Sequence, residues 1–173
     1  MNCKKYSIVL IVLSLTLFIS AATVLAIGDD KYSQPSLKGL KKLTVVVQIE
    51  KPVADDFKTV GLTEERIRTG IELRLREASI DVVYAESLPS DTPVFHVEVN
   101  GSKRSDKTFS FLIEVELWQK ASLKRNPQIE VIAATWSAGV FGLGSASNIA
   151  SDVMGWMNGM MDAFIKAHAS VNS

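Results

Sequence analysis

Residues 94–117, VFHVEVNGSKRSDKTFSFLIEVEL, decide the fold of this chain. Apolar and polar side chains alternate in both halves of the stretch, which predicts two β-strands with one buried face each. Asn100-Gly101 favours a turn between them, so the strands form a hairpin. The predicted register pairs Phe95 with Ile113, Val97 with Phe111 and Val99 with Phe109. Every large odd-numbered apolar residue then lies on one face, as a buried hairpin face requires.

Three other segments are predicted to belong to the same sheet. Residues 43–49 are β-branched and almost continuously apolar, which is typical of a strand covered on both faces. Residues 80–84 predict a short strand. After a turn at Asn126, residues 129–135 continue the odd-numbered apolar face on a last strand. Residues 139–147 are rich in Gly and Ser and predict a flexible loop.

Two amphipathic helices complete the pattern. The first begins after Thr63, a favourable N-cap residue, and carries an apolar stripe from Ile67 to Ala78. The second covers about residues 148–168, with a stripe from Ile149 to Phe164. The order β-α-β-β-β-β-α predicts an α+β fold, a two-layer sandwich with a mainly antiparallel sheet and two helices on one face. The other face is left for solvent or a partner.

The first 26 residues have the pattern of an export signal. Lys4 and Lys5 open the chain, and no charged residue follows until Asp29. The apolar stretch between them ends in small residues that favour cleavage after Ala26, with Ala22 as a second cleavage position. We therefore expect a signal peptide that directs the protein to the periplasm or out of the cell.

Retention of this segment as a membrane anchor is the alternative. The uncharged residues 6–28 are long enough to cross a hydrocarbon layer of ~30 Å, and they would hold the chain at the inner membrane. A lipid anchor is not expected, because Cys3 precedes the apolar segment instead of following it. After the signal we expect a linker over residues 27–42, a single domain over residues 43–168 and a tail over residues 169–173.

The composition excludes several classes of function. Loss of Lys4 and Lys5 with the signal reduces 19 basic residues to 17, against 19 acidic ones. Such a balance lacks the basic footprint of a nucleic-acid-binding protein. Cys3 is the single cysteine, so the mature chain has no disulfide and no cysteine ligand. No phosphate loop, nucleophile motif or metal-ligand spacing is present, and we expect no catalytic, cofactor or metal site.

The polar face of the predicted sheet carries the best candidate site. Pairing of the last two strands around Asn126 places four large apolar side chains on this face, namely Leu112, Trp118, Ile132 and Trp136. Aromatic residues are favoured at interfaces, and exposed apolar patches mark contact surfaces. We therefore predict a non-enzymatic domain that binds a protein or an envelope component through this face. A second copy of the chain is a further candidate partner.

The same face also carries the alternative function, an enzyme of undefined class. Its candidate acid–base groups are His96, Glu114 and Glu116. In the predicted register His96 lies opposite Leu112 and Val94 opposite Glu114, so the histidine and the carboxylates are staggered. The sequence therefore favours binding over catalysis.

The layout from Leu43 onward resembles small exported bacterial envelope proteins with one sheet and two helices. The resemblance rests on the Glu- and Arg-rich first helix, on the Ala-Ser-Ile-Asp-Val stretch at residues 78–82, on the strand end at Thr135-Trp136 and on the last helix. The lipopolysaccharide-assembly lipoprotein and the amino-terminal domain of the Tol translocation protein are of this type. The resemblance implies an envelope location and the same sandwich. It transfers no functional residue, and this chain lacks the lipid-attachment cysteine of the lipoprotein.

Overall fold

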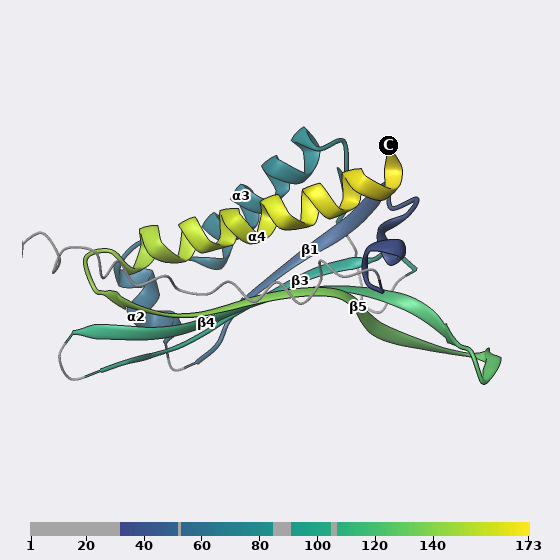
Figure 1. The fold of residues 1–173 in the computed structure, drawn as a ribbon. Helices are drawn as coiled ribbons and strands as arrows, with labels where there is room; N and C mark the ends of the chain where they lie inside the picture. The colour runs from purple at the N-terminus through teal and green to yellow at the C-terminus, as the bar shows by residue number, and fades with distance from the viewer. Residues whose placement is uncertain (1–31, 52, 85–90, 105–106) are drawn as a thin grey trace, which may run out of the picture.

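The computed structural model describes residues 32–51, 53–84, 91–104 and 107–173, and the predictions for residues 1–31 lie outside this part. The strands are β1 (Lys42–Ile49), β2 (Asp81–Val82), β3 (Val94–Lys103), β4 (Thr108–Leu123) and β5 (Asn126–Ser145). The helices are η1 (Gln34–Leu37), α2 (Ala54–Thr59), α3 (Glu64–Glu77) and α4 (Ile149–Asn172). Figure 1 shows α3 and α4 above one face of the sheet, so the predicted α+β sandwich is confirmed.

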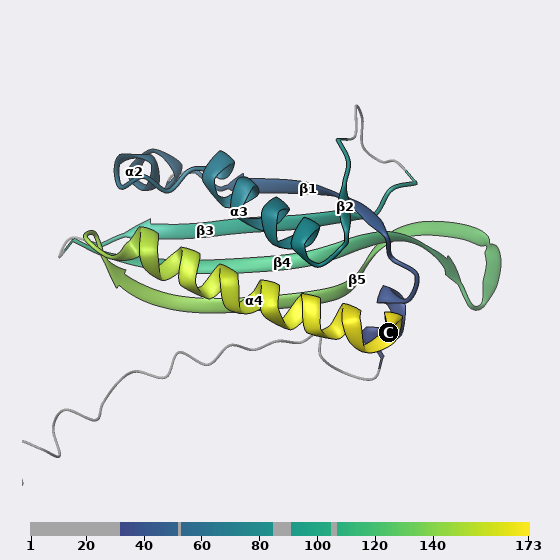
Figure 2. The ribbon, with the colours of Figure 1, turned by 90° about the horizontal axis from the view of Figure 1, so that it is seen from above.

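The five strands form one mixed sheet in the order β2-β1-β3-β4-β5. β1 runs parallel to both of its neighbours, while β4 is antiparallel to both β3 and β5. Seen from above, α3 lies over the side of the sheet that contains β1, and α4 runs along the side that contains β5 (Figure 2). Both helices thereby bury the odd-numbered face of β3 and β4, which is apolar from Phe95 to Val99 and from Phe109 to Leu117.

The β3–β4 hairpin has the predicted faces but a different register. Phe95 pairs with Leu117 instead of Ile113, a shift of four residues along β4. The shift arises because β3 continues through Asn100-Gly101 to Lys103, where the sequence predicted a turn. An even-numbered shift keeps each side chain on its own face. Phe95 and Phe111 are therefore buried as expected.

A β-bulge changes the faces of the last strand. Leu117 pairs with Trp136 but the next residue, Trp118, pairs with Ala134, so Thr135 is an extra residue in β5. The Thr135 hydroxyl donates to the Leu117 carbonyl at 3.2 Å and accepts from the Gln119 amide at 2.7 Å, which holds the bulge in place. Beyond it the even-numbered residues face the helices. Trp136 is consequently buried, 1 % exposed, and its predicted place on the polar face is wrong.

Several boundaries differ from the predicted ones. The Gly- and Ser-rich residues 139–145 are strand, not loop, because β5 extends to Ser145. The predicted strand at 80–84 shortens to β2, and α2 is an additional helix. Leu37 of η1 and Leu40 are buried in the core, so the folded region begins before residue 43. At the other end, α4 continues through most of the predicted tail.

The start of α3 follows the prediction. The Thr63 hydroxyl accepts from the Arg66 backbone N–H at 3.2 Å, as an N-cap residue does. Glu64 and Glu65 occupy the first turn, where the helix dipole favours anions. None of the helices in the described residues is both long enough and apolar enough to cross a membrane.

Candidate functional site

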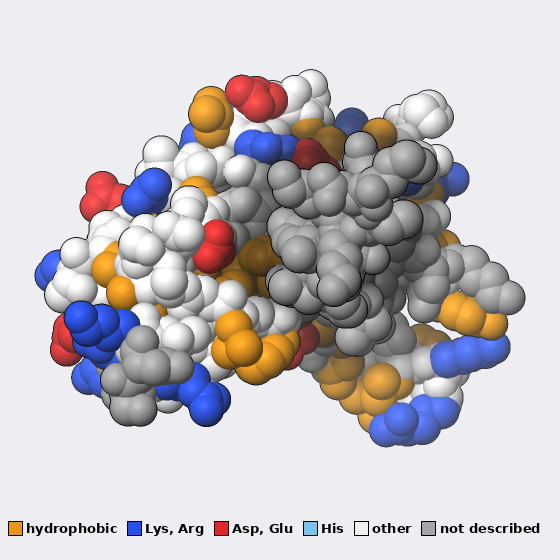
Figure 3. All heavy atoms as spheres, turned by 60° about the vertical axis from the view of Figure 1, so that its left-hand side comes forward, with side chains coloured by type: hydrophobic (Ala, Val, Ile, Leu, Met, Phe, Trp, Pro, Cys, Tyr) orange, Lys and Arg blue, Asp and Glu red, His pale blue; other side chains and the backbone are white. Residues whose placement is uncertain are grey.

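The face of the sheet turned away from α3 and α4 is called the outer face here. It consists of the side chains whose parity is opposite to that of the core. In β3 and β4 these are Val94, His96 and Glu98, and Leu112, Glu114, Glu116 and Trp118; after the bulge in β5 they are Ser137, Gly139, Phe141 and Leu143. Along the lower edge of the space-filling view in Figure 3, hydrophobic side chains lie between two groups of basic ones.

The four residues predicted to form one patch are separated in the structure. Leu112 and Trp118 do lie on the outer face, but they are six residues apart on β4, which corresponds to about 20 Å along a strand. Ile132 pairs with Lys120 on the part of the β4–β5 hairpin that extends beyond β3. Trp136 belongs to the core, where its ring contacts the rings of Phe95 and Phe164.

The extending part of the hairpin, residues 119–133, is called the arm. Lys120 ties its base to the neighbouring loop through an ion pair with Asp91. The hydrogen bond between them lowers the pKa of Asp91 below its ordinary value and raises that of Lys120. Ile129 and Ile132 are exposed on the arm. The predicted patch residue Ile132 therefore lies on the arm and not on the part of the outer face that backs the core.

Around Trp118 the outer face forms a small polar–aromatic cluster. The rings of His96 and Trp118 are stacked, with centroids 4.4 Å apart and planes inclined by 17°. The indole N–H of Trp118 donates to the Glu116 carboxylate at 2.7 Å. His96 lies opposite Glu116, not Leu112, in the observed register. The candidate acid–base groups His96 and Glu116 are thus neighbours, and each is in contact with Trp118.

Next to this cluster the outer face is acidic. Glu98 and Glu114 lie directly opposite each other on β3 and β4. Two like charges in a cross-strand pair destabilise a sheet. The Asn100 side-chain amide donates to the Glu98 carboxylate at 2.6 Å, while Glu114 is exposed. Together with Glu116 they give the middle of the face a negative charge that a basic partner would neutralise.

Sequence reasoning missed the most exposed apolar residues of the outer face, Phe141 and Leu143. Their side chains are 64 % and 62 % exposed, and Phe141 lies opposite Leu112. Both fall in the segment predicted to be a glycine-rich loop. The alternation of Trp136, Ala138 and Val140 with smaller residues was the signal for a strand, but the glycines outweighed it. With Leu112 these two residues form what we call the apolar end of the outer face.

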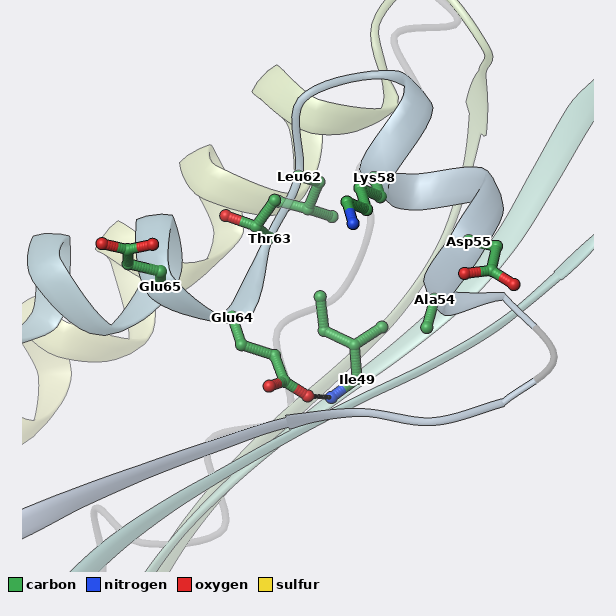
Figure 4. Close-up of a pocket in the computed structure, with 8 residues that line it drawn as sticks. All are labelled: Ile49, Ala54, Asp55, Lys58, Leu62, Thr63, Glu64 and Glu65. Carbon is green, nitrogen blue, oxygen red and sulfur yellow. Dashed lines mark hydrogen bonds between the residues drawn. The ribbon is translucent and has the colours of Figure 1, made fainter.

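A pocket lies elsewhere, at the end of β1. It has a volume of about 440 Å³, is open to solvent and is lined by Ile49, by α2 and by the start of α3. Figure 4 shows the Glu64 carboxylate directed at the Ile49 backbone N–H, from which it accepts a hydrogen bond at 3.0 Å. Asp55, Lys58 and Glu65 lie around the rim, so the charges are mixed. Because Glu64 already binds the backbone, the pocket does not present it as a free ligand group.

The described residues contain no group of three or more His, Cys, Asp or Glu side chains that could hold a metal ion. No family model and no curated protein matches this chain. The geometry of the outer face therefore carries the functional argument. Its parts are an acidic middle, an aromatic cluster at one end and two exposed apolar side chains at the other.

Proposed function

We propose that the protein is exported to the periplasm or secreted, and that it is a non-enzymatic domain that binds a protein or an envelope component through the outer face. One observation carries the proposal. Exposed Phe141 and Leu143 lie on the same face of the sheet as a row of glutamates, and neither α3 nor α4 covers that face. Export is supported by the signal pattern of residues 1–26.

The physical properties of the face fit a contact surface. Exposed apolar side chains contribute to binding when a partner removes them from water, whereas on a free surface they contribute nothing. The acidic row of Glu98, Glu114 and Glu116 steers partners of opposite charge and rejects acidic ones. A partner that presents basic side chains around an apolar centre would match both properties.

The test is photo-crosslinking of the full chain in the cells that export it. A photoreactive amino acid replaces Glu114, which is exposed in the middle of the outer face. The matched control carries the same amino acid in place of Glu77, an exposed glutamate at the end of α3 on the helix side. We expect adducts with another cell component from position 114, separated from self-adducts by mass, and few from position 77.

A charge reversal gives the second half of the test. Glu114→Lys should weaken the adducts formed from a neighbouring outer-face position such as Leu112, while Glu77→Lys should leave them unchanged. Equal adducts from both faces, or none from the outer face, would contradict the proposal.

A further inference from the structure

The free edge of β5 is the longest unpaired edge in the described part of the sheet. β5 is the last strand in the sheet order, and after the bulge it runs for ten residues from Trp136 to Ser145. In the view of Figure 2 no other strand lies beyond it. An exposed sheet edge is a template for pairing with another strand.

The outward backbone groups of this edge belong to the odd-numbered residues. The Ala146 N–H donates to the Lys107 carbonyl, which marks residues 107 and 146 as a hydrogen-bonded pair. Such pairs alternate along an antiparallel ladder, so the even-numbered residues of β5 bond to β4. The N–H and C=O groups of Gly139, Phe141 and Leu143 then point away from the sheet. Among the described residues, none outside β4 and β5 forms a hydrogen bond with a backbone group between Ser137 and Leu143.

This edge also lacks the charges that protect the edges of monomeric proteins. No charged residue and no proline occurs between Glu130 and Asp152. Natural edge strands are usually blocked by lysine, proline or inward-pointing charges. When a strand pairs antiparallel with its own copy, a charged side chain near the two-fold axis lies close to its own counterpart, which is unfavourable. A strand without charges avoids that cost.

The opposite edge of the sheet is protected in two ways. β2 covers only the start of β1, pairing with Lys42 and Leu43, and it carries the charged Asp81. Further along, the Glu64 carboxylate accepts from the Ile49 N–H at 3.0 Å and so occupies a donor that an added strand would need. The chain thus blocks one edge with carboxylates and leaves the other neutral.

The geometry points to antiparallel pairing of β5 with β5 of a second copy, over residues 137–145, into a continuous ten-stranded sheet. Two-fold symmetry maps the outer face of one copy onto the outer face of the other. Pairing over residues 137–145 places the two-fold axis at residue 141. The Phe141 side chain, 64 % exposed in one copy, would therefore meet its counterpart, and Leu143, 62 % exposed, would lie diagonal to the partner's Phe141 on the same face. The pairing satisfies the backbone groups of the edge and buries apolar surface in one step.

Sedimentation velocity of the full chain in mild detergent tests this pairing. We expect a dimer for the unmodified chain. Leu143→Lys should raise the dimer dissociation constant roughly tenfold or more, because in each copy it replaces an apolar side chain, diagonal to the partner's Phe141, by a charged one. Leu73→Lys makes the same change at a residue of α3 that is 57 % exposed, and it should leave the dimer intact. That control separates pairing of the edge from a general effect of the added charge, and association through residues 1–31 would survive both variants.

Cysteine cross-linking gives an independent measurement. Phe141→Cys in a Cys3→Ser background should form a covalent dimer with a short bismaleimide, whereas Leu73→Cys should not. A monomeric unmodified chain, a dimer that survives Leu143→Lys, or equal cross-linking at positions 141 and 73 would overturn the pairing. If the edge instead pairs with a strand of a different protein, the purified chain would be monomeric, and this result too would overturn pairing between two copies. Adducts from Glu114 to another component do not depend on this outcome.

Discussion

At the scale of single residues, Gly142 is the position least tolerant of a side chain. A Cβ atom at Gly142 would lie 2.3 Å from Cζ of Phe111, whose ring covers the strand backbone at this point. Phe111 is buried and pairs with Gly142 across β4 and β5. We expect Gly142→Ala to destabilise the fold by about 1–3 kcal/mol, the usual cost of overpacking a core. Denaturant unfolding followed by circular dichroism measures it.

Gly139→Ala is the matched control in the same strand. The Cβ of an alanine at 139 would lie on the outer face, 3.4 Å from the Ile113 carbonyl oxygen and 3.8 Å from Glu114. Its free energy of unfolding should change by less than about 0.5 kcal/mol, as for most surface substitutions. Equal losses for the two variants would show that the Phe111 ring is not the cause.

Trp136 shows which feature of β5 could not be predicted from the sequence, namely the bulge. The parity of Trp136 predicts the polar face if β5 is regular, and Thr135 alone moves it to the core. A bulge of this kind depends on contacts with residues distant in sequence, here Gln119 and η1. Neither contact has a local sequence signal. Leu112 and Trp118 were placed correctly because β4 pairs with β3 without interruption.

At the scale of elements, α4 carries two glycines that nothing in the structure requires. Gly155 and Gly159 are exposed, and a Cβ at either would have no atom within 4 Å. Glycine in a helix interior costs about 1 kcal/mol relative to alanine. We expect Gly159→Ala to stabilise the fold by up to about that amount and to raise the thermal midpoint, which calorimetry measures.

Gly70→Ala in α3 serves as the comparison for this helix effect. An added Cβ there would lie 3.4 Å from Cε of Met154, which is an ordinary van der Waals contact, so a gain of similar size is expected. A loss of stability for Gly159→Ala would mean that its surface is packed in the assembled protein.

Elements with a long, regular period were predicted well. The stripes of α3 and α4 and the alternation of β3 and β4 each repeat over many residues, and the core confirms them. The register was not predictable, because alternation has a period of two and every even shift satisfies it. α2 and η1 were missed because helices of six and four residues are too short for a periodic stripe.

At the scale of the whole molecule, the export prediction concerns residues outside the described part. We expect cleavage after Ala26, because small residues close the apolar segment there. Amino-terminal sequencing of the protein recovered from the envelope would then begin at Ile27. An intact start at Met1 in the membrane fraction would show that residues 6–28 remain as an anchor, and a start at Thr23 would select the second cleavage position.

The two ends of the fold are held together by side chains. Asn172 accepts from the Gly39 N–H at 2.6 Å and donates to the Leu37 carbonyl at 2.9 Å, and His168 bonds the Leu40 carbonyl. The carboxyl terminus therefore lies beside η1 (Figure 1). A circular permutant could join residue 173 to residue 33 by a short linker and reopen the chain at the arm tip, between Arg125 and Asn126. It would retain every strand pairing of the sheet outside the arm. The same three-dimensional arrangement could thus be encoded with the elements in a different linear order.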